Sequence, residues 1–311
     1  MRILFATDGS VAADRARDLL QRIDLPADSY IRVAGVRRHS PNPFPASRSL
    51  APGDASTFAG SVARVTATAV APPPIVDHLG IMLDTTVATL EAAERRVERV
   101  VLDGHPGPAI VDEARDMTAD LVIVGSRGHG TIESMLLGSV SRHVASHAPC
   151  SVLVARSQHL RSVLLASDGS EDARRAERAI VTWPMFAHAT VRVVSVAQTG
   201  VPMAIGGVPG LYDQVIEQYE EDVDKARLDA SSEAEAAAQR LTDAGRPATW
   251  DERDGDPAGE IVRAAAAASS DLIVTGTQGR TGLPRLLLGS VAANVAGHAT
   301  ASVLIVRGPQ G

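Results

Sequence analysis

Residues 120–128 read Asp-Leu-Val-Ile-Val-Gly-Ser-Arg-Gly, and residues 271–279 read Asp-Leu-Ile-Val-Thr-Gly-Thr-Gln-Gly. Each is a short run of mostly branched apolar residues that ends on a glycine turn, which predicts a buried strand followed by a tight loop. In both places a further glycine and a serine, at 138–139 and 289–290, follow the last glycine of the stretch after nine intervening residues. Because the spacing is the same in both, it indicates a duplicated unit.

The opening of the chain also occurs twice. Residues 3–10 read Ile-Leu-Phe-Ala-Thr-Asp-Gly-Ser, and residues 163–170, 160 positions later, read Val-Leu-Leu-Ala-Ser-Asp-Gly-Ser. The glycine turns are only 151 positions apart, so the first copy holds nine extra residues, which we place in the Pro-, Ser- and Ala-rich stretch at about 38–74. We therefore predict two domains, 1–157 and 158–311, the first of which carries this stretch as a mobile loop rather than an ordered lid.

Strands and helices are expected to alternate within each copy. Short Val/Ile/Leu runs bounded by turn residues are separated by longer Ala/Arg/Glu-rich stretches, the pattern of βα units in a parallel sheet. Hydrophobic residues make up 45% of the chain but aromatic residues only 3%, so the cores must be aliphatic, as suits a parallel sheet covered on both faces. We expect strands near 2–7, 31–36, 97–102, 120–125 and 151–155, and again near 162–167, 190–196, 248–253, 271–276 and 302–306. Helices are expected near 11–22, 78–96, 107–118 and 134–147, with a longer one near 211–243.

Composition and charge exclude several classes of protein. A net charge of −7 argues against a general nucleic-acid binder, which presents a basic surface to phosphates. Lys225 is the single lysine, so almost every cation is an arginine. The one cysteine, Cys150, lies in an apolar run and is expected to be a buried structural thiol, which fits a reducing compartment. No apolar run approaches the roughly 20 residues of a membrane-spanning helix, and the first residues are typical of a strand, so we expect a cytoplasmic protein with no membrane partner.

The glycine turns indicate phosphate chemistry. In an open parallel sheet, ligands bind beyond the carboxyl ends of the strands, where both turns are expected to lie. Glycines there let backbone amides approach an anion, and a helix that begins near Gly138 adds unpaired amides and a favourable dipole. The hydroxyls of Ser139, Ser141 and Ser290 can add hydrogen bonds. An isolated Gly-x-x-Gly would indicate only a tight turn, but the repeated long spacing favours a ligand site that is neither a Walker P-loop nor a dinucleotide fingerprint.

Two other kinds of site have less support in the sequence. Asp8 and Asp168 follow the first strand of each copy, where a carboxylate suits a phosphoacceptor or a nucleophile. No second acid adjoins them and no lysine is available, which favours hydrogen bonding to a ribose, and a helix cap is compatible with either role. His143 and His147 have the spacing of metal ligands on one helix face, but no carboxylate or cysteine completes the set, so we expect surface histidines and no metal site.

At these residues the chain resembles the universal stress protein family, in particular its ATP-binding branch, whose motif is Gly-x2-Gly-x9-Gly-Ser/Thr. Both copies match this motif, and the resemblance covers nearly all of the chain except the 38–74 stretch. It implies an α/β fold of two tandem doubly wound domains, each a five-stranded parallel sheet of order 3-2-1-4-5 flanked by helices. It also implies that the strands near 151–155 and 302–306 pair with each other, so that the chain is an intramolecular pseudo-dimer, and it leaves open whether two chains form a homodimer.

The resemblance assigns ligand contacts to both copies. In the first copy, adenine and ribose would contact Ala6, Thr7, Asp8 and Val36, and the phosphate loops comprise Gly125, Ser126, Arg127, Gly128, His129, Gly138, Ser139, Val140 and Ser141. The matching residues of the second copy are Ala166, Ser167, Asp168 and Val196, followed by Gly276, Thr277, Gln278, Gly279, Arg280, Gly289, Ser290 and Val291. Ala292 stands where the first copy has Ser141, which predicts a phosphate grip about tenfold weaker in the second copy.

We therefore expect a stress-response or regulatory binding protein whose cofactor is ATP, with or without Mg²⁺. Its expected partners are the adenine nucleotide and an unidentified regulatory protein. A slow ATPase is the enzymatic alternative, although the sequence offers no evident general base or dedicated metal site. A different adenine nucleotide, such as AMP or cAMP, is the third possibility, and the same glycine turns would serve all three.

Overall fold

The computed structural model of the chain describes residues 1–37, 77–128, 137–198, 211–279 and 288–308, and the 38–74 stretch, His129 and Arg280 lie outside them. The first half contains β1 (Arg2–Ala6), α1 (Val11–Arg22), β2 (Tyr30–Arg37), α2 (His78–Glu91), β3 (Arg96–Asp103), α3 (Pro106–Asp116), β4 (Leu121–Gly125), α4 (Ser139–His147) and β5 (Ser151–Ala155). The second half contains β6 (Ser162–Ala166), α5 (Glu171–Thr182), the 3₁₀ turn η1 (Pro184–Phe186), β7 (Thr190–Ala197), α6 (Leu211–Asp243), β8 (Ala248–Asp254), α7 (Pro257–Ala267), β9 (Leu272–Gly276), α8 (Ser290–His298) and β10 (Ser302–Val306).

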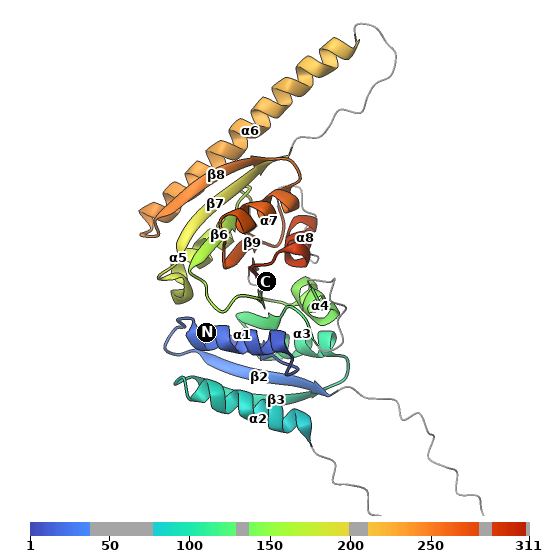
Figure 1. Cartoon of the computed structure of the whole chain (residues 1–311), viewed down its shortest axis with the longest axis vertical. Coiled ribbons are helices and arrows are strands. Elements are labelled where there is room, and N and C mark those ends of the chain that lie inside the picture. The colour runs from blue at the N-terminus through green and yellow to red at the C-terminus, as the bar shows by residue number, and fades with distance from the viewer. Residues whose placement is uncertain (38–76, 129–136, 199–210, 280–287, 309–311) are drawn as a thin grey trace, which may run out of the picture.

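The ten strands of the described residues belong to one sheet, in the order β3-β2-β1-β4-β5-β10-β9-β6-β7-β8. Within each half the strands pair in parallel, and from the outer edge to the centre each half has the order 3-2-1-4-5. The α/β fold and the strand order expected from the sequence are therefore confirmed. Figure 1 shows the two halves arranged end to end, with one end of α6 projecting beyond the sheet.

The two halves meet through their last strands. β5 and β10 pair antiparallel, with Val154 opposite Val303 and Val152 opposite Ile305. This is the pairing that the resemblance implied for these two strands. It makes the sheet continuous across the molecule, and the paired residues of the two strands are buried Val, Leu and Ile side chains.

Two arginines, one from each half, cross this junction. Arg156 follows β5 and donates from Nη2 to the carbonyl of Ala296 at 2.6 Å, near the end of α8. Arg307 follows β10 and donates from Nη1 to the carbonyl of Ala148, at the end of α4. Each cation thus lies at the C-terminus of a helix of the other half, where it meets unpaired carbonyls and the negative end of the dipole. Burial and, next, the charge of Arg127 lower the pKa of Arg156 to about 10, so it stays charged near neutral pH.

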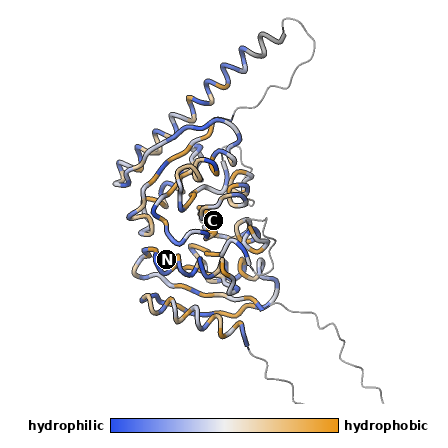
Figure 2. Tube along the Cα trace, in the orientation of Figure 1, coloured by the Kyte–Doolittle hydropathy of each residue, from blue (hydrophilic) through white to orange (hydrophobic). Residues whose placement is uncertain are grey.

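The core has two layers because both faces of the sheet are covered. Along β1, Ile3 and Phe5 point to the face covered by α1, α2, α5 and α6, whereas Leu4 and Ala6 point to the face covered by α3, α4, α7 and α8. All four side chains are 0–8% exposed, and burying each large one contributes about 1.5–3 kcal/mol. In Figure 2, hydrophilic and hydrophobic residues alternate along α6, as expected for a helix that packs one face on the sheet.

Two helix boundaries expected from the sequence were wrong. The helix expected at 134–147 begins at Ser139, as α4. The helix expected at 78–96 ends at Glu91 as α2, and Glu94 then adopts a left-handed φ of 57°, where α6 of the second half is followed by Gly245 at φ 80°. A non-glycine residue rarely takes this conformation, so the sequence carried no stop signal. A tertiary contact stabilises the chain after this turn, because Arg95 Nη2 donates to the carbonyl of Ile23 at 2.6 Å.

Among the described residues, no helix combines the length and the apolar character that crossing a membrane requires.

Candidate functional site

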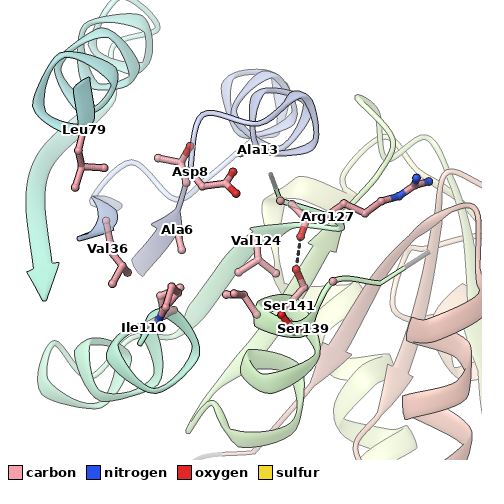
Figure 3. Close-up of a pocket in the computed structure, with 17 residues that line it drawn as sticks. Ala6, Asp8, Ala13, Val36, Leu79, Ile110, Val124, Arg127, Ser139 and Ser141 are labelled. Atoms are coloured by element: carbon pink, nitrogen blue, oxygen red, sulfur yellow. Dashed lines mark hydrogen bonds between the residues drawn. The ribbon is translucent and has the colours of Figure 1, made fainter. Parts of the chain in front are cut away.

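A cavity of about 410 Å³ opens at the carboxyl edge of the first half's sheet. It lies at the ends of β1, β2 and β4 and beside the beginnings of α3 and α4, which is the switch point of a 3-2-1-4-5 sheet (Figure 3). Its lining consists of Ala6, Thr7, Asp8, Ala13, Ala34, Val36, Leu79, Pro106, Ile110, Val124, Gly125, Arg127, Gly128, Gly138, Ser139, Val140 and Ser141.

One side of the cavity is apolar. Val36 at the end of β2, Leu79 in the first turn of α2 and Ile110 in α3 face it, together with Ala6 and Val124 from the two central strands (Figure 3). These aliphatic side chains come from five different elements and carry no charge. Such a wall suits a flat apolar group, for example the two faces of an aromatic base.

Asp8 supplies the carboxylate of the cavity. Its Oδ1 accepts a hydrogen bond from the amide of Ser10 at 3.0 Å, and the Ser10 side chain in turn caps α1 by accepting from Ala13. A Cβ added at Gly128 would lie 2.4 Å from Asp8 Oδ2, so the glycine turn packs directly against the carboxylate. Ser10 therefore caps α1, while the Asp8 carboxylate supports this capping turn and also lines the cavity, two roles that are compatible, as expected from the sequence.

Gly125 is required by packing rather than by access to a ligand. A Cβ there would lie 2.8 Å from the carbonyl carbon of Ala12 and 2.8 Å from the amide nitrogen of Ala13, both backbone atoms at the start of α1. The first helix can reach the end of β4 only because residue 125 has no side chain. This close approach brings the Asp8 turn and the Gly128 turn to the same end of the cavity.

The N-terminus of α4 faces the polar end of the cavity. Gly138 is its N-cap, with no side-chain hydrogen bond to the cap among the described residues, and the first intrahelical bond runs from the amide of Arg142 to the carbonyl of Gly138 at 2.9 Å. The amides of Ser139, Val140 and Ser141 therefore precede the intrahelical ladder. Together with the positive end of the helix dipole, they favour an anion at this position.

The Ser141 hydroxyl has a protein partner. It donates to the carbonyl of Gly125 at 2.6 Å, which Figure 3 shows as a dashed line. In the second half Ala292 takes its place, and the hydroxyl of Thr275 donates instead to the carbonyl of Gly276 at 3.2 Å. The exchange of Ser141 for Ala292 thus changes how a turn carbonyl is satisfied, and the expected tenfold difference in phosphate grip stays a prediction.

The structure brings most of the expected first-half residues together. Eleven of them line the cavity, whereas Ser126 is 8% exposed and does not, and His129 lies outside the described residues. Sequence reasoning missed six lining residues: Leu79, Pro106 and Ile110 from α2 and α3, and Ala13, Ala34 and Val124 from α1, β2 and β4. Pro106 does carry a usable signal, because a proline at the first helical position directly after a strand marks a helix N-terminus at the carboxyl edge.

The second-half residues occupy matching places on their own elements. Ala166 ends β6 and Ser167 and Asp168 follow it, and Asp168 Oδ1 accepts from the amide of Ser170 at 3.0 Å as Asp8 does from Ser10. The remaining described positions lie at the end of β7 (Val196), at the end of β9 (Gly276, Thr277, Gln278, Gly279) and at the start of α8 (Gly289, Ser290, Val291).

Neither the histidine pair nor the cysteine forms a reactive site in the described structure. The rings of His143 and His147 stack with centroids 4.2 Å apart, and no group of three or more possible metal ligands occurs among the described residues. Burial and then the charge of His147 lower the pKa of His143. Cys150 is 8% exposed, and burial raises the pKa of its thiol to about 12, which makes it the inert structural thiol that its apolar context predicted.

Comparison with known proteins gives one family throughout. The sequence model of the "Universal stress protein family" matches residues 1–156 and again residues 159–307. A universal stress protein of Mycolicibacterium smegmatis is 30% identical over 250 residues, which are 75% of this chain and 73% of the relative. A universal stress protein of Mycobacterium tuberculosis is 30% identical over 222 residues, 65% of this chain and 66% of the relative. Among solved structures, a universal stress protein from Archaeoglobus fulgidus superimposes with a TM-score of 0.60 at 17% identity, covering 98% of both chains, and so shares the fold.

Proposed function

The chain belongs to the universal stress protein family, and from this premise we propose that its first half binds an adenine nucleotide, with ATP as the ligand of choice. One observation carries the proposal: a single cavity joins an aliphatic wall to a glycine turn and to a helix N-terminus that no side chain of the described residues caps. The wall suits the base, and the backbone amides suit the phosphates. Its volume of about 410 Å³ lies in the range of small-molecule sites.

Individual residues take the following parts in this proposal. The base lies between Val36 and Ile110, and the Asp8 carboxylate accepts hydrogen bonds from ribose hydroxyls. The phosphates lie at the amides of the Gly128 turn and at the first turn of α4. The Arg127 side chain points away from the cavity (Figure 3), so backbone amides rather than this guanidinium hold the phosphates in the proposal. Mg²⁺, where present, is held mainly by the phosphates and water, as is usual for this ion.

Binding without rapid turnover is the role that the cavity supports best. Asp8 is the single carboxylate among its described lining residues, and Oδ1 of Asp8 already accepts from the Ser10 amide, so a poised general base is lacking in that lining. We propose a regulatory module that changes its affinity for another protein with nucleotide occupancy, in the cytoplasm, where a free thiol such as Cys150 is stable. Slow ATP hydrolysis is the enzymatic alternative.

The test has two steps. Protein purified without added nucleotide is denatured and its released ligands are identified by chromatography and mass spectrometry; titration calorimetry then compares ATP, AMP, cAMP and GTP, with and without Mg²⁺. We expect ATP to bind and to remain intact for hours, and GTP to bind at least about tenfold more weakly. Val36→Trp should abolish binding in the first half by filling the base slot, whereas the matched Val196→Trp should leave first-half binding unchanged. Calorimetry silent towards all four nucleotides would refute the proposal, steady ADP release would favour the ATPase, and tighter AMP or cAMP binding would change the assigned ligand.

A further inference from the structure

The glycine turn of the second half contains a carboxylate from its own helix. Asp172 lies in the first turn of α5, and its Oδ2 accepts a hydrogen bond from the backbone amide of Gln278 at 3.1 Å and another from the hydroxyl of Thr277. Both donors belong to the loop that follows β9, between the two glycines of the motif. The loop therefore directs one of its amides at a negative charge supplied by the protein.

The carboxylate is held firmly in this position. Arg175, one helical turn further along α5, forms an ion pair with Oδ1 of Asp172, and the Asp172 side chain is only 15% exposed. The Ser170 hydroxyl donates to the carbonyl of Gln278 at 3.3 Å, so side chains from the α5 end fix this residue at both its amide and its carbonyl. A Cβ on Gly276 would lie 2.7 Å from the backbone of Asp172, which shows how closely the helix and the turn pack.

The first half lacks this carboxylate. By the 160-residue repeat, Ala12 stands where Asp172 stands, and its methyl group cannot accept a hydrogen bond. The rest of the arrangement is the same in both halves, because Ser10 Oγ donates to the carbonyl of Arg127 at 3.2 Å as Ser170 Oγ donates to that of Gln278. The carboxylate that accepts from the turn amide in the second half thus has no counterpart at position 12 of the first half.

A second carboxylate replaces an apolar side chain at the end of the neighbouring strand, β6. By the 151-residue repeat, Glu233 of α6 corresponds to Met82 of α2. Ser167 Oγ donates to Glu233 at 3.1 Å, whereas the equivalent Thr7 lies 3.8 Å from the sulfur of Met82. Glu233 is 10% exposed and also pairs with Arg240 at 2.9 Å. The second half therefore presents two fixed carboxylates where the first half presents a methyl group and a thioether.

Resting on the function proposed above, we propose that Asp172 closes the second glycine turn to phosphate, so that the chain loads one nucleotide, in its first half. A phosphate at the second turn would have to displace a carboxylate from the Gln278 amide or lie beside a like charge, which is unfavourable at short range. We expect this to weaken nucleotide binding in the second half by roughly 100-fold relative to the first. Two copies of the same motif thereby differ in occupancy.

The experiment counts nucleotides per chain and locates them. Native mass spectrometry and calorimetry with ATP give the stoichiometry, and photo-crosslinking with 8-azido-ATP followed by peptide mapping identifies the half. The wild-type chain should bind one ATP and be labelled in the first half. Asp172→Ala should bind a second ATP and acquire label in the second half. Asp172→Asn, which keeps the acceptor but removes the charge, should give a second site of intermediate affinity, and it serves as the test if Asp172→Ala does not fold.

The reciprocal variant introduces the carboxylate into the first half, where the sequence already has the matching arginine. Ala12→Asp places a carboxylate at the first turn, and Arg15 corresponds to Arg175 and is available to hold it. This variant should lose first-half binding by about 100-fold while its unfolding midpoint shows that it is folded. Two ATP molecules on the wild-type chain, or unchanged binding by Ala12→Asp, would overturn this inference and leave the proposed function standing. A wild-type chain that binds no nucleotide would overturn both.

Discussion

Replacing Gly125 by alanine is expected to destabilise the protein although the change adds one methyl group. The new Cβ would lie 2.8 Å from both the carbonyl carbon of Ala12 and the amide nitrogen of Ala13. These are backbone atoms of α1, so relief requires the helix to move away from β4. Overpacking of this kind costs about 1–3 kcal/mol, and since no flexible side chain can yield here we expect about 3 kcal/mol.

Gly138→Ala is the matched control in the same motif. A Cβ at Gly138 would lie 3.5 Å from the nearest atoms, which belong to Ser126 and Arg127, and the φ of −72° suits alanine. The free energy of unfolding should fall by less than about 1 kcal/mol, because alanine is only a poorer N-cap than glycine. Because Gly138 lines the cavity, its methyl group should nevertheless weaken ATP binding.

The assay is urea unfolding followed by circular dichroism near neutral pH, with ATP calorimetry on the same samples. Gly125→Ala should show a lower free energy of unfolding and weaker binding, and Gly138→Ala should show weaker binding at nearly wild-type stability. If Gly125→Ala were as stable as the wild-type protein within about 0.5 kcal/mol, the steric argument would be wrong. The same holds if both variants lost equal stability.

Three further changes test other parts of the structure by urea unfolding. Arg307→Ala should lower the free energy of unfolding by about 2–4 kcal/mol, because it removes a charged donor from the carbonyls at the end of α4. The control Arg115→Ala, at a side chain that is 60% exposed, should lower it by less than about 0.5 kcal/mol. Equal losses would contradict the view that Arg307 stabilises the junction. Ser141→Ala should cost about 1–3 kcal/mol, because it leaves a buried carbonyl of Gly125 without this donor, and a neutral result would mean that water replaces the hydroxyl. The pKa of the Cys150 thiol is raised to about 12 in the folded protein, against about 9.0 unfolded, so the thiol contributes to the free energy of unfolding below pH 9 and this contribution is lost as the pH rises through 12. The stability advantage of the wild-type protein over Cys150→Ala should therefore fall by about 1.4 kcal/mol between pH 8 and pH 10. A stability difference that does not change with pH would contradict this prediction.

The parts of this structure that follow from local pattern could be predicted from the sequence. The strands at 121–125 and 272–276 are continuous aliphatic runs that end on glycine, and a parallel sheet buried on both faces leaves few other places for them. The end of α6 was visible because Gly245 supplies the left-handed turn. The end of α2 was not, since Glu94 adopts the same conformation without a local signal and tertiary contacts stabilise it.

The candidate site likewise contains residues that could be predicted from the sequence and residues that could not. Asp8 and Gly138 were predictable because the repeat places both at strand or helix ends on the carboxyl edge. Leu79 and Ile110 were not, because their positions depend on how α2 and α3 pack against the sheet. The contact of Asp172 with Gln278 joins residues 106 positions apart, and an acid in the first turn of a helix is so common that it carries no warning.

The two ends of α4 connect the proposed nucleotide site to the junction between the halves. Its N-terminus lines the cavity at Gly138, and its C-terminal carbonyls receive Arg307 from the other half, so the helix dipole is available to an anion at one end and held by a cation at the other. α4 has nine residues and spans roughly 14 Å, which is short enough for both charges to act on the same helix. A bound polyphosphate should therefore strengthen the Arg307 contact, and by linkage the contact should strengthen nucleotide binding. We expect Arg307→Ala to weaken ATP binding several-fold from outside the cavity, and the ATP-induced rise in the unfolding midpoint to shrink with it. Unaltered ATP affinity in a folded Arg307→Ala protein would show that the nucleotide at one end of α4 and Arg307 at the other act on the helix independently. The junction between the halves would then not respond to nucleotide binding.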